Sequence, residues 1–464
     1  MLTYQDFLRA GNKENFIIEL ISEHKTSKQY HVAVDAENYN RQQNTTIMKY
    51  QKFLYKLTGQ KIVDTISPNY KMASNYLNRF ITQLNQYLLG NGATFTDETT
   101  KGKLGVDFDT QLQKAGRSSL IEGVSFGFWD FDKLRVFKLI EFAPLYDEEN
   151  GSLRAGARFW QLDNDKPMRI TFYEEDGYTE YIYKIGEEIE VIKPKTTYKQ
   201  IVKYTAISGE EIYQGENYPN FPIVPFYANP ERQSELVGIR EQIDAYDLIK
   251  SGFANDLDGH MLYWILENAG GMDDPDIARL IERMKTLGAV ISDEDAQVKM
   301  QQLDIPYESR IAYLDRLEED LYKDFGALKV DIISSSATTA TQINAAYLPL
   351  DCKTDQYEYE CIEFVRNILK LQGIEDIPQF KRNKIANQSE ATTMILQASN
   401  YLDDETVLKH LPFLSPDEIE TILKNKEKEE AERFKLASDI QNMQQTDETD
   451  EENEEVENED EQAG

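Results

Sequence analysis

The sequence NPERQSELVGIREQIDAYDLIKSGFANDLDGH, residues 229–260, predicts one long helix, and PYESRIAYLDRLEEDLYKDF, residues 306–325, predicts another. Asn229 followed by Pro230 is typical of a helix start, because asparagine caps free backbone N–H groups and proline fits the first helical position. At 1.5 Å per residue the first helix would be about 45 Å long. Apolar residues recur at helical spacing in both: Leu236, Ile239, Ile243, Tyr246, Ile249, Phe253 and Leu257, then Ile311, Leu314, Leu317, Leu321 and Phe325.

Between these helices lies a short segment, residues 261–305. Gly270-Gly271 and Asp273-Asp274-Pro275 interrupt it, so it is too broken to continue either helix. Two long helices that flank a compact insert predict a hairpin that projects a small domain away from the body.

Upstream of the hairpin, the pattern changes from helix to sheet. The first 120 residues are mainly helical in pattern, and residues 70–89 form an apolar helix that ends at Gly90-Asn91-Gly92. From residue 124 to 207 the period is two, with turn residues between the runs, which predicts an antiparallel β meander. A proline-rich connector, residues 218–226, closes it. The strand-like runs are residues 135–142, 169–173, 178–183 and 188–192.

Downstream of the hairpin the chain is polar and then helical again. Residues 332–341 are small and uncharged, and residues 342–372 form a helix that Pro349 should kink. Ser415-Pro-Asp-Glu418 is a capping box, which predicts a helix that runs to about Ile440. The acidic tail, residues 441–464, should be disordered. The fold class is therefore α+β and mainly helical.

The chain is strongly acidic, with a formal net charge of -33 from 50 basic and 83 acidic residues. A protein that grips DNA presents clustered Lys and Arg, and no such cluster occurs here. Nucleic acid is either no partner or must pass without sticking, and the surplus of acids also serves solubility. No signal peptide and no apolar run of about 20 residues is evident, so we expect no membrane partner and a cytosolic origin. Cys352 and Cys361 would face opposite sides of a helix, so we expect no disulfide.

No enzyme motif is complete in this sequence. Gly151 to Gly156 has the glycine spacing of a phosphate-binding loop, but Ala157 and Arg158 replace its lysine and hydroxyl residue, which favours a hairpin turn. A calcium-loop pattern from Asp163 to Glu174 has proline and methionine at two required positions. The histidines are scattered, so no transition-metal site is indicated. Acidic pairs could bind magnesium in a nuclease, but in so acidic a chain solvated helix faces explain them better. We predict no catalytic residues, no metal and no cofactor. The histidines are His24, His31, His260 and His410.

Up to about residue 440, the order of segments resembles the portal proteins of long-tailed bacteriophages. Several local phrases are similar to that family, and their order and spacing match as well. They are NQYLLGN at Asn85–Asn91, PLYD at Pro144–Asp147 with Gly151 and Ala157-Arg158 after it, IVPFYANPER at Ile223–Arg232, IDAY at Ile243–Tyr246 and AND at Ala254–Asp256. The proline after Asn229 and the acidic tail depart from the family pattern.

The resemblance implies a portal fold and a ring of twelve copies at one capsid vertex. Double-stranded DNA would pass through its channel without sequence specificity during packaging and ejection. The other implied partners are the terminase large subunit, then a head–tail adaptor, with major capsid and scaffolding proteins around the ring. The protein would reside in the virion, and in the host cytoplasm during assembly. The implied regions are a wing at 1–228, stem helices at 229–260 and 306–325, a clip at 261–305, a tunnel loop at 326–341, a kinked helix at 342–372 and a crown at 373–440.

Three groups of residues are candidates for these roles. An acidic stem helix would repel phosphate and keep DNA sliding; it carries Glu308, Asp315, Glu318, Glu319, Asp320 and Asp324. Hydroxyls of the tunnel loop would touch the DNA backbone without charge, unless the loop is only a surface linker; they are Ser334, Ser335, Ser336, Thr338, Thr339 and Thr341. A charged clip patch would contact motor or adaptor, unless it is only a solvated helix face; it comprises Asp273, Asp274, Asp276, Arg279, Arg283 and Lys285.

Two other functions are compatible with the sequence. A different virion or scaffolding protein would lack a central channel. A metal-dependent DNA-processing enzyme would need carboxylates clustered in a cleft and would cleave DNA when magnesium is added. The portal function alone predicts a ring with a hole.

Overall fold

The structure is a computed structural model that describes residues 2–55, 59–65, 67–163, 165–184, 186–205, 211–259, 262–267, 275–276, 279, 297–302, 307–330, 340–384, 395–411, 419, 421–426 and 428. The chain divides into two compact units. The first unit contains residues 1–335 and 345–384, and the second contains residues 336–344 and 385–464.

The first unit begins with short helices, as the sequence predicts. Thr3 and Asp6 form a reciprocal capping box at the first helix, and Asn12 caps the second. The helices are α1 (Tyr4–Arg9), α2 (Lys13–Thr26), α3 (Lys28–Asn40) and α4 (Thr45–Lys49). A small hairpin follows, with strands β1 (Phe53–Tyr55) and β2 (Lys61–Val63).

The predicted antiparallel meander is confirmed as a five-stranded sheet in the order β10-β9-β8-β7-β6. Its strands are β6 (Phe142–Tyr146), β7 (Leu153–Trp160), β8 (Met168–Glu174), β9 (Gly177–Tyr183) and β10 (Glu190–Thr196). Phe7, Phe16 and Ile17 of α1 and α2 pack with Ala157 and Phe172 of the sheet in one apolar core. Gly151 lies in the β6–β7 turn with φ of +68°, so the glycine pair at 151 and 156 belongs to a hairpin.

The single strand predicted at residues 135–142 is wrong. The structure divides it into β5 (Lys133–Lys138), a 3₁₀ turn η1 (Leu139–Glu141) and the start of β6. The turn is stable because buried side chains satisfy its backbone. The Glu122 carboxylate accepts from the Ile140 N–H, and the His24 ring bonds the Leu139 carbonyl at 2.8 Å. The chain thereby passes from one sheet to the next.

A second sheet has the order β13-β4-β5, with β4 at Val124–Asp130 and β13 at Ile223–Tyr227. The proline-rich connector therefore contains a strand, contrary to prediction. Pro225 is tolerated because β13 is an edge strand, where a missing N–H costs no ladder hydrogen bond. A separate hairpin joins β11 (Lys199–Thr205) to β12 (Glu211–Glu216).

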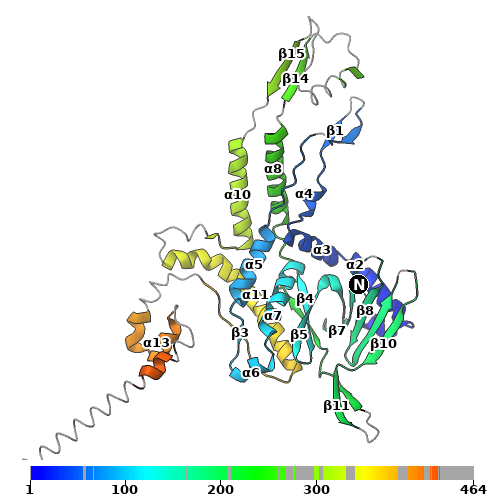
Figure 1. Cartoon of the computed structure of the whole chain (residues 1–464), viewed down its shortest axis with the longest axis vertical. Coiled ribbons are helices and arrows are strands. Elements are labelled where there is room, and N and C mark those ends of the chain that lie inside the picture. Colours follow the sequence, from blue (N-terminus) through cyan, green and yellow to red (C-terminus); the bar gives the residue numbers. More distant parts are fainter. Residues whose placement is uncertain are drawn as a thin grey trace, which may run out of the picture. The chain divides into compact units, whose positions relative to one another are not determined.

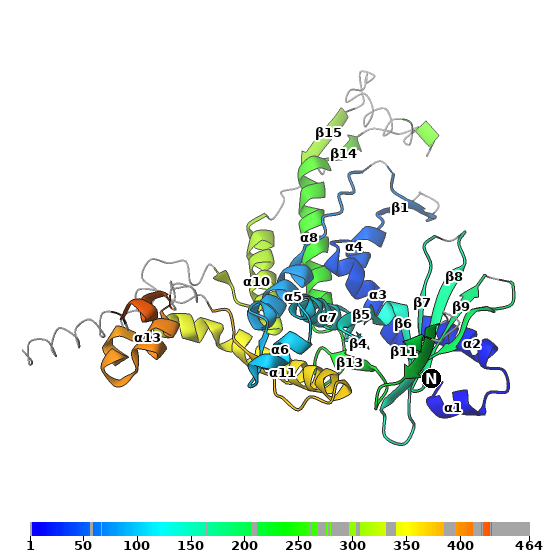
Figure 2. The ribbon, with the colours of Figure 1, turned by 60° about the horizontal axis from the view of Figure 1, so that its bottom comes forward.

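Helices cover this second sheet. The long helix α11 (Ala340–Leu371) approaches this sheet closely, because a Cβ at Gly127 of β4 would lie 2.5 Å from the Phe364 ring. It also packs closely on the helix that contains Gly116, where a Cβ would lie 2.1 Å from the Tyr357 hydroxyl. Figure 2 shows α11 beside α7 and β13. The other helices and strands of this region are α5 (Tyr76–Leu89), β3 (Ala93–Thr94), α6 (Glu98–Lys103), α7 (Phe108–Glu122) and β16 (Gln379–Phe380).

The predicted helical hairpin is present, with one correction. The helix α8 spans Arg240–Gly259, and α10 spans Tyr307–Phe325. Between them lie the paired strands β14 (Leu262–Glu267) and β15 (Gln297–Gln302) (Figure 1). The first helix starts eleven residues later than predicted, because the Asn229 side chain closes a turn with the Gln233 backbone instead of capping a helix. Its 20 residues span about 30 Å.

The start of the helix predicted at residues 70–89 is also displaced. Residues 70–75 are not helical, and α5 begins at Tyr76, although it ends at Gly90 as predicted. The first unit also extends further than the predicted crown boundary at 373. Residues 373–384 belong to it because β16 pairs with β3 and Arg382 forms an ion pair of 3.0 Å with Asp351 of α11.

The second unit is described only in part. It contains η3 (Ser399–Tyr401) and α13 (Asp404–His410), and Asp403 caps α13 by accepting from the Thr406 N–H. The Lys426 ammonium lies 2.5 Å from the Asp404 carboxylate. The predicted capping box at 415–418 and the acidic tail lie outside the described residues.

Candidate functional site

The α8–α10 hairpin is held by an apolar seam and by polar contacts along it. Leu317 and Leu321 of α10 are buried. The Arg310 guanidinium lies 2.5 Å from the Asp256 carboxylate of α8, and Gln242 of α8 donates to Asp324 of α10. Because contacts occur along the whole length of the pair, the two helices form one rod-like element.

A second face of α8 is buried and polar. Along it, three side chains accept hydrogen bonds from a non-helical segment that precedes α5: Asn255 from the Tyr70 N–H at 2.6 Å, Ser251 from the Met72 N–H at 2.9 Å and Asp247 from the Ser74 N–H at 2.8 Å. All three acceptors are less than 5% exposed. We call this set the polar ladder.

The spacing of the polar ladder has a simple geometric basis. Four helical residues rise about 6.0 Å, and two residues of extended chain span about 6.6 Å. Acceptors four residues apart on α8 therefore match every second N–H of an antiparallel extended segment. Burial raises the pKa of Asp247, against the hydrogen bonds that Asn44 and Ser74 donate to its carboxylate.

The predicted apolar stripe of α8 is wrong in its C-terminal part, where the polar ladder is buried instead. Leu236, Ile239 and Ile243 are buried as predicted, but Tyr246, Ile249 and Phe253 are only partly buried and Leu257 is 59% exposed. The sequence does contain the signal, since Asp247, Ser251 and Asn255 recur at a helical spacing of four. It was missed because polar residues were assumed to face solvent.

The six acids of α10 do not form a uniform negative surface. Three have cationic neighbours: Asp320 with Arg316 at 3.0 Å, Glu319 with Lys323 at 3.4 Å and Glu318 with Lys329 at 3.4 Å. Asp324 accepts from Gln242. Within the part of the chain that the structure describes, no ion pair reaches Glu308 or Asp315, and both are exposed. Among the described residues, the negative charge of α10 without an ion pair therefore lies on Glu308, Asp315 and Asp324.

The candidate clip residues are described only at Asp276 and Arg279. These two side chains are exposed and lie 3.7 Å apart. The remaining members of the patch, Asp273, Asp274, Arg283 and Lys285, lie outside the described residues. The strands β14 and β15 pair in an antiparallel register, with Trp264 opposite Met300.

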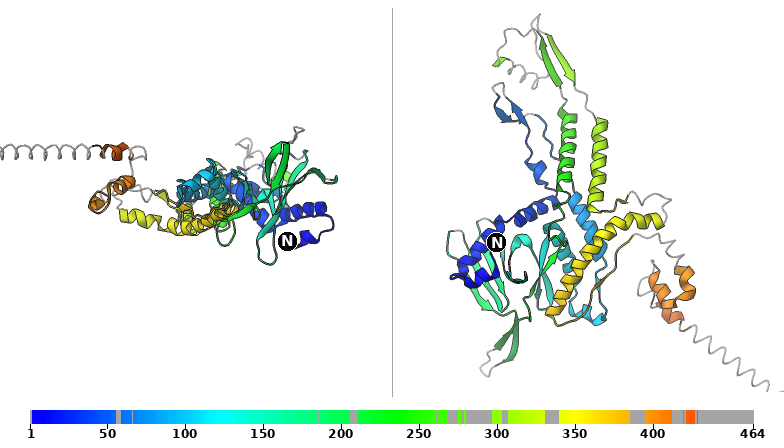
Figure 3. Two further views of the ribbon diagram at one scale, coloured as in Figure 1. Left: turned by 90° about the horizontal axis from the view of Figure 1, so that it is seen from below. Right: turned by 180° about the vertical axis from the view of Figure 1, so that it is seen from behind.

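Of the candidate tunnel-loop hydroxyls, only Thr341 falls within the described residues. It is exposed in the first turn of α11. Ser334, Ser335, Ser336, Thr338 and Thr339 lie outside the described residues. Pro349 stands inside α11 as predicted, and the ribbon of α11 bends along its course (Figure 3, right).

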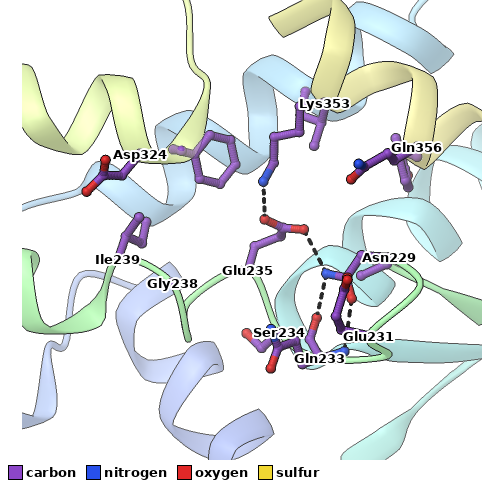
Figure 4. A pocket seen from close by; sticks show the side chains of 14 residues that line it. Asn229, Glu231, Gln233, Ser234, Glu235, Gly238, Ile239, Asp324, Lys353 and Gln356 are labelled. Carbon is purple, nitrogen blue, oxygen red and sulfur yellow. Dashed lines mark hydrogen bonds and ion pairs between the residues drawn. The ribbon is translucent and has the colours of Figure 1, made fainter. Parts of the chain in front are cut away.

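A small cavity of about 200 Å³ joins the end of α10, the turn before α8 and the middle of α11. Figure 4 shows Lys353 of α11 pointing at Glu235. The two charged atoms are 2.5 Å apart, and the Lys353 ammonium also lies 4.3 Å from the centre of the Phe325 ring. Asn229 donates to the second oxygen of Glu235 at 3.0 Å. This contact ties α11, four residues beyond Pro349, to the base of the hairpin.

A buried pair of carboxyl groups lies where α3, α7 and β5 meet. Glu122 is 1% exposed, and burial together with the adjacent Glu37 raises its pKa well above the ordinary value. Burial opposes ionisation of Glu37 too, but hydrogen bonds from Lys138 and Glu122 outweigh it and lower the Glu37 pKa. Glu37 therefore ionises before Glu122, and the Lys138 ammonium balances the Glu37 charge.

Neither a metal cluster nor a membrane-spanning helix occurs in the described part of the chain. No group of three His, Cys, Asp or Glu residues there is arranged to hold a metal ion. Among the described helices, none is long and apolar enough to cross a membrane. Cys352 is exposed and Cys361 is buried, and both are free thiols on α11.

Comparison with known protein families identifies the family of this chain. Residues 30–432 match the family described as "Phage portal protein, SPP1 Gp6-like". The chain belongs to the phage portal protein family.

Two curated portal proteins are similar in sequence. The portal protein of Bacillus phage SPP1 is 23% identical over 438 residues, which cover 81% of this chain and 79% of that protein. The portal protein of Clostridium phage phiCD119 is 27% identical over 222 residues, which cover 46% of this chain and 49% of that protein. The chain thus matches about half the length of the clostridial phage protein.

Solved structures show looser similarity. A chain from the neck of an empty gene transfer agent (GTA) particle has a TM-score of 0.38 and 11% identity, and covers 72% of this chain and 88% of that chain. A chain from the virion of a native GTA particle has a TM-score of 0.34 and 11% identity, with 75% and 89% covered.

The family settles the class of protein. Portal proteins are structural components of phage particles and not enzymes, and the mixed helix and sheet of this chain is consistent with that membership. The resemblance stated from the short phrases in the sequence is therefore confirmed.

Proposed function

We propose that this chain assembles into a ring at one capsid vertex, where it forms the channel for DNA packaging and ejection. The ring docks the terminase large subunit during packaging and a head–tail adaptor afterwards. The observation that carries this proposal is the antiparallel α8–α10 hairpin with β14–β15 at its turn, in a chain of the portal family.

In this proposal, the position of each region relative to the α8–α10 hairpin gives its role. Residues 1–228, which contain both sheets, form the wing, and α8 and α10 form the stem. Residues 261–305 form the clip, which faces the motor and later the adaptor. Residues 326–341 form the tunnel loop, α11 with Pro349 forms the kinked helix, and residues 373–440, most of which belong to the second unit, form the crown.

The stem suits a channel that must not hold DNA. With a net charge of -33 in the whole chain, a ring would expose few cations to phosphate, so few counterions would be released on binding. Glu308 and Asp315 add unpaired negative charge on α10. Weak binding to phosphate leaves the duplex free to slide.

The tunnel loop and α11 act as a coupled element in this proposal. The hydroxyls at 334–336, 338, 339 and 341 touch the DNA backbone, and displacement of the loop is passed along α11. The Lys353–Glu235 contact carries that displacement to the base of α8. Asp276 and Arg279 lie in the clip patch that meets the motor or adaptor.

Electron microscopy of the purified protein tests the proposal most directly. A ring with a central hole, of about twelve copies by native mass spectrometry, is the expected result. A compact single-copy particle at all protein concentrations would overturn it. Addition of magnesium and duplex DNA serves as the control for a nuclease, and DNA should stay intact.

Replacement of Ser334, Ser335 and Ser336 by bulky residues tests the loop separately. Rings should form as before, while packaged DNA per particle should fall. Unchanged packaging would remove the loop from the mechanism but leave the ring intact. Charge reversal at Asp276 and Arg279 should lower terminase or adaptor binding in a pull-down, and unchanged binding would assign these residues to a solvated surface.

A further inference from the structure

The helix α8 lies between two other segments of the same copy, one on each side. On one side it contacts α10, and on the other it holds residues 45–75, which we call the stem arm. The polar ladder fixes the stem arm to α8. Figures 1 and 2 show the order α10, α8, stem arm from two directions. Because α8 separates them, the outer faces of α10 and of the stem arm cannot meet within one copy.

The stem arm is basic in an otherwise acidic chain. It contains five lysines and one aspartate. Lys52 donates to the Pro68 carbonyl at 2.6 Å, and Lys61 lies 3.7 Å from the centre of the Phe53 ring. Over the described residues, no carboxylate pairs with Lys49, Lys52, Lys61 or Lys71. Their charge is therefore available to an acidic partner.

Apolar side chains accompany these lysines. Phe53 and Val63 are a cross-strand pair of the β1–β2 hairpin, so they lie on one face of it, and they are 42% and 48% exposed. Tyr50, just before the hairpin, is 41% exposed. An exposed apolar surface rimmed by uncompensated lysines is typical of a contact surface for another protein.

The outer face of α10 has the complementary character. Glu308, Ile311, Asp315 and Glu319 are spaced by three, four and four residues, so they form one stripe along the helix. All are exposed, and Ile311 is 42% exposed. The carboxylates of Glu308 and Asp315 flank Ile311 and have no intramolecular ion pair among the described residues.

We propose that the stem arm of one copy packs against the Glu308–Glu319 stripe of α10 in the neighbouring copy, with lysines facing carboxylates and Phe53 and Val63 facing Ile311. This interface rests on the proposed ring. A ring needs a head-to-tail contact made by two different surfaces on opposite sides of each subunit. The stem arm and the stripe are two such surfaces, with opposite charge and matched apolar centres.

Charge reversal tests the pairing. The first variant carries Lys49→Glu and Lys61→Glu, and the second carries Glu308→Lys and Asp315→Lys. Each should raise the protein concentration needed for half-maximal ring formation by about tenfold or more, because like charges then meet across every interface. The variant with all four changes should restore assembly close to that of the wild type. Mass photometry over a concentration series measures the ring fraction.

A matched control separates this interface from net charge. Lys28→Glu with Lys103→Glu changes the charge by the same amount at exposed lysines outside the stem arm, and should assemble as the wild type does. Circular dichroism of each variant verifies folding. The proposed interface is wrong if neither double charge reversal affects ring formation. It is also wrong if the variant with all four changes assembles no better than the two double variants. Normal rings with reduced terminase or adaptor binding would assign the surfaces to that partner and also overturn it.

A cross-link gives an independent readout. In a Cys352→Ser background, Phe53→Cys and Ile311→Cys should join neighbouring copies under oxidation, giving a ladder of multimers on a non-reducing gel. A cross-link confined to single copies would contradict the proposal. If the wild-type protein forms no ring at all, the proposed function fails and the interface with it; if rings form without the cross-link, only the interface fails.

Discussion

The core of residues 1–228, the proposed wing, and the buried face of α8 are held together in opposite ways. In the wing, aromatic rings pack without polar partners: Phe142 is fully buried, 4.5 Å from Phe126 and 6.0 Å from Phe137 between ring centres. On α8, Asp247, Ser251 and Asn255 are buried beside Ile243, and each of the three accepts a hydrogen bond from the backbone of the stem arm. Apolar packing is strong but non-directional, whereas hydrogen bonds fix one alignment at little net gain.

The two regions therefore contribute differently to the folded protein. The wing core supplies stability, since buried aromatic area is the largest favourable term in folding. The polar ladder supplies alignment of the stem arm on α8. Substitutions should therefore unfold the wing in one case and release a local segment in the other.

The largest effect is expected for Phe142→Ala in the wing core. Loss of a buried ring and the cavity left behind should cost about 3–5 kcal/mol of unfolding free energy. Denaturant titration followed by circular dichroism measures it, and hydrogen exchange should rise throughout β6 and β7. Leu162→Ala, at a residue that is 90% exposed, is the control and should change stability by less than about 0.5 kcal/mol. Equal effects of the two variants would mean that this core does not stabilise the wing.

A smaller and more local effect is expected for Asp247→Leu in the polar ladder. The Ser74 N–H and the Asn44 amide lose their acceptor, at a cost of about 1–3 kcal/mol. Hydrogen exchange should accelerate at residues 70–74 while the wing strands stay protected. Glu241→Gln, at an exposed position of the same helix, should leave exchange unchanged. Loss of protection in both regions at once would show that they unfold as one unit.

Glu122→Gln should change the pH dependence of stability rather than its maximum. The folded-state pKa of Glu122 lies above its ordinary value, so ionisation costs more in the folded than in the unfolded protein. Stability from this group is present below the ordinary pKa and is lost as pH rises through the raised one. Glutamine can still accept from Ile140 and donate to Glu37. The melting temperature of the wild type should therefore fall relative to that of the variant as pH rises from the ordinary carboxyl range through the raised pKa of Glu122; parallel curves would contradict the raised pKa.

The smallest effect is expected for Lys323→Ala on the surface of α10. Its partner Glu319 is 3.4 Å away and both side chains are more than half exposed, so the ion pair should contribute less than about 0.5 kcal/mol. The same denaturant titration measures it. A loss comparable to that of Asp247→Leu would mean that surface charge, and not the polar ladder, holds the stem.

The sequence predicted the elements better than their boundaries. The helix spacing of α10, the period of two in the meander and the glycines that end α5 were all sufficient signals. The start of α8 was missed because Asn229 and Pro230 suit a turn as well as a cap. The strand β13 was missed because Pro225 is disfavoured in strands except at an edge, and edge position is a tertiary property.

For the candidate site, local patterns were less informative. The predicted acidic surface of α10 contains real acids, but Arg316, Lys323 and Lys329 pair with three of them, and Lys329 lies beyond the helix. The polar ladder depends on a segment more than 170 residues away in sequence. Neither contact can be read from one helix alone, because each is formed only when distant segments meet.

The match between every fourth residue of α8 and every second residue of the stem arm has a mechanical consequence. A twist of α8 by one residue, about 100°, would turn all three acceptors away from their donors together. Axial rotation of this helix is therefore blocked unless residues 70–74 are released first. Torque applied to α8 is borne jointly by α8 and the stem arm, and passes into α5, which begins directly after Asn75.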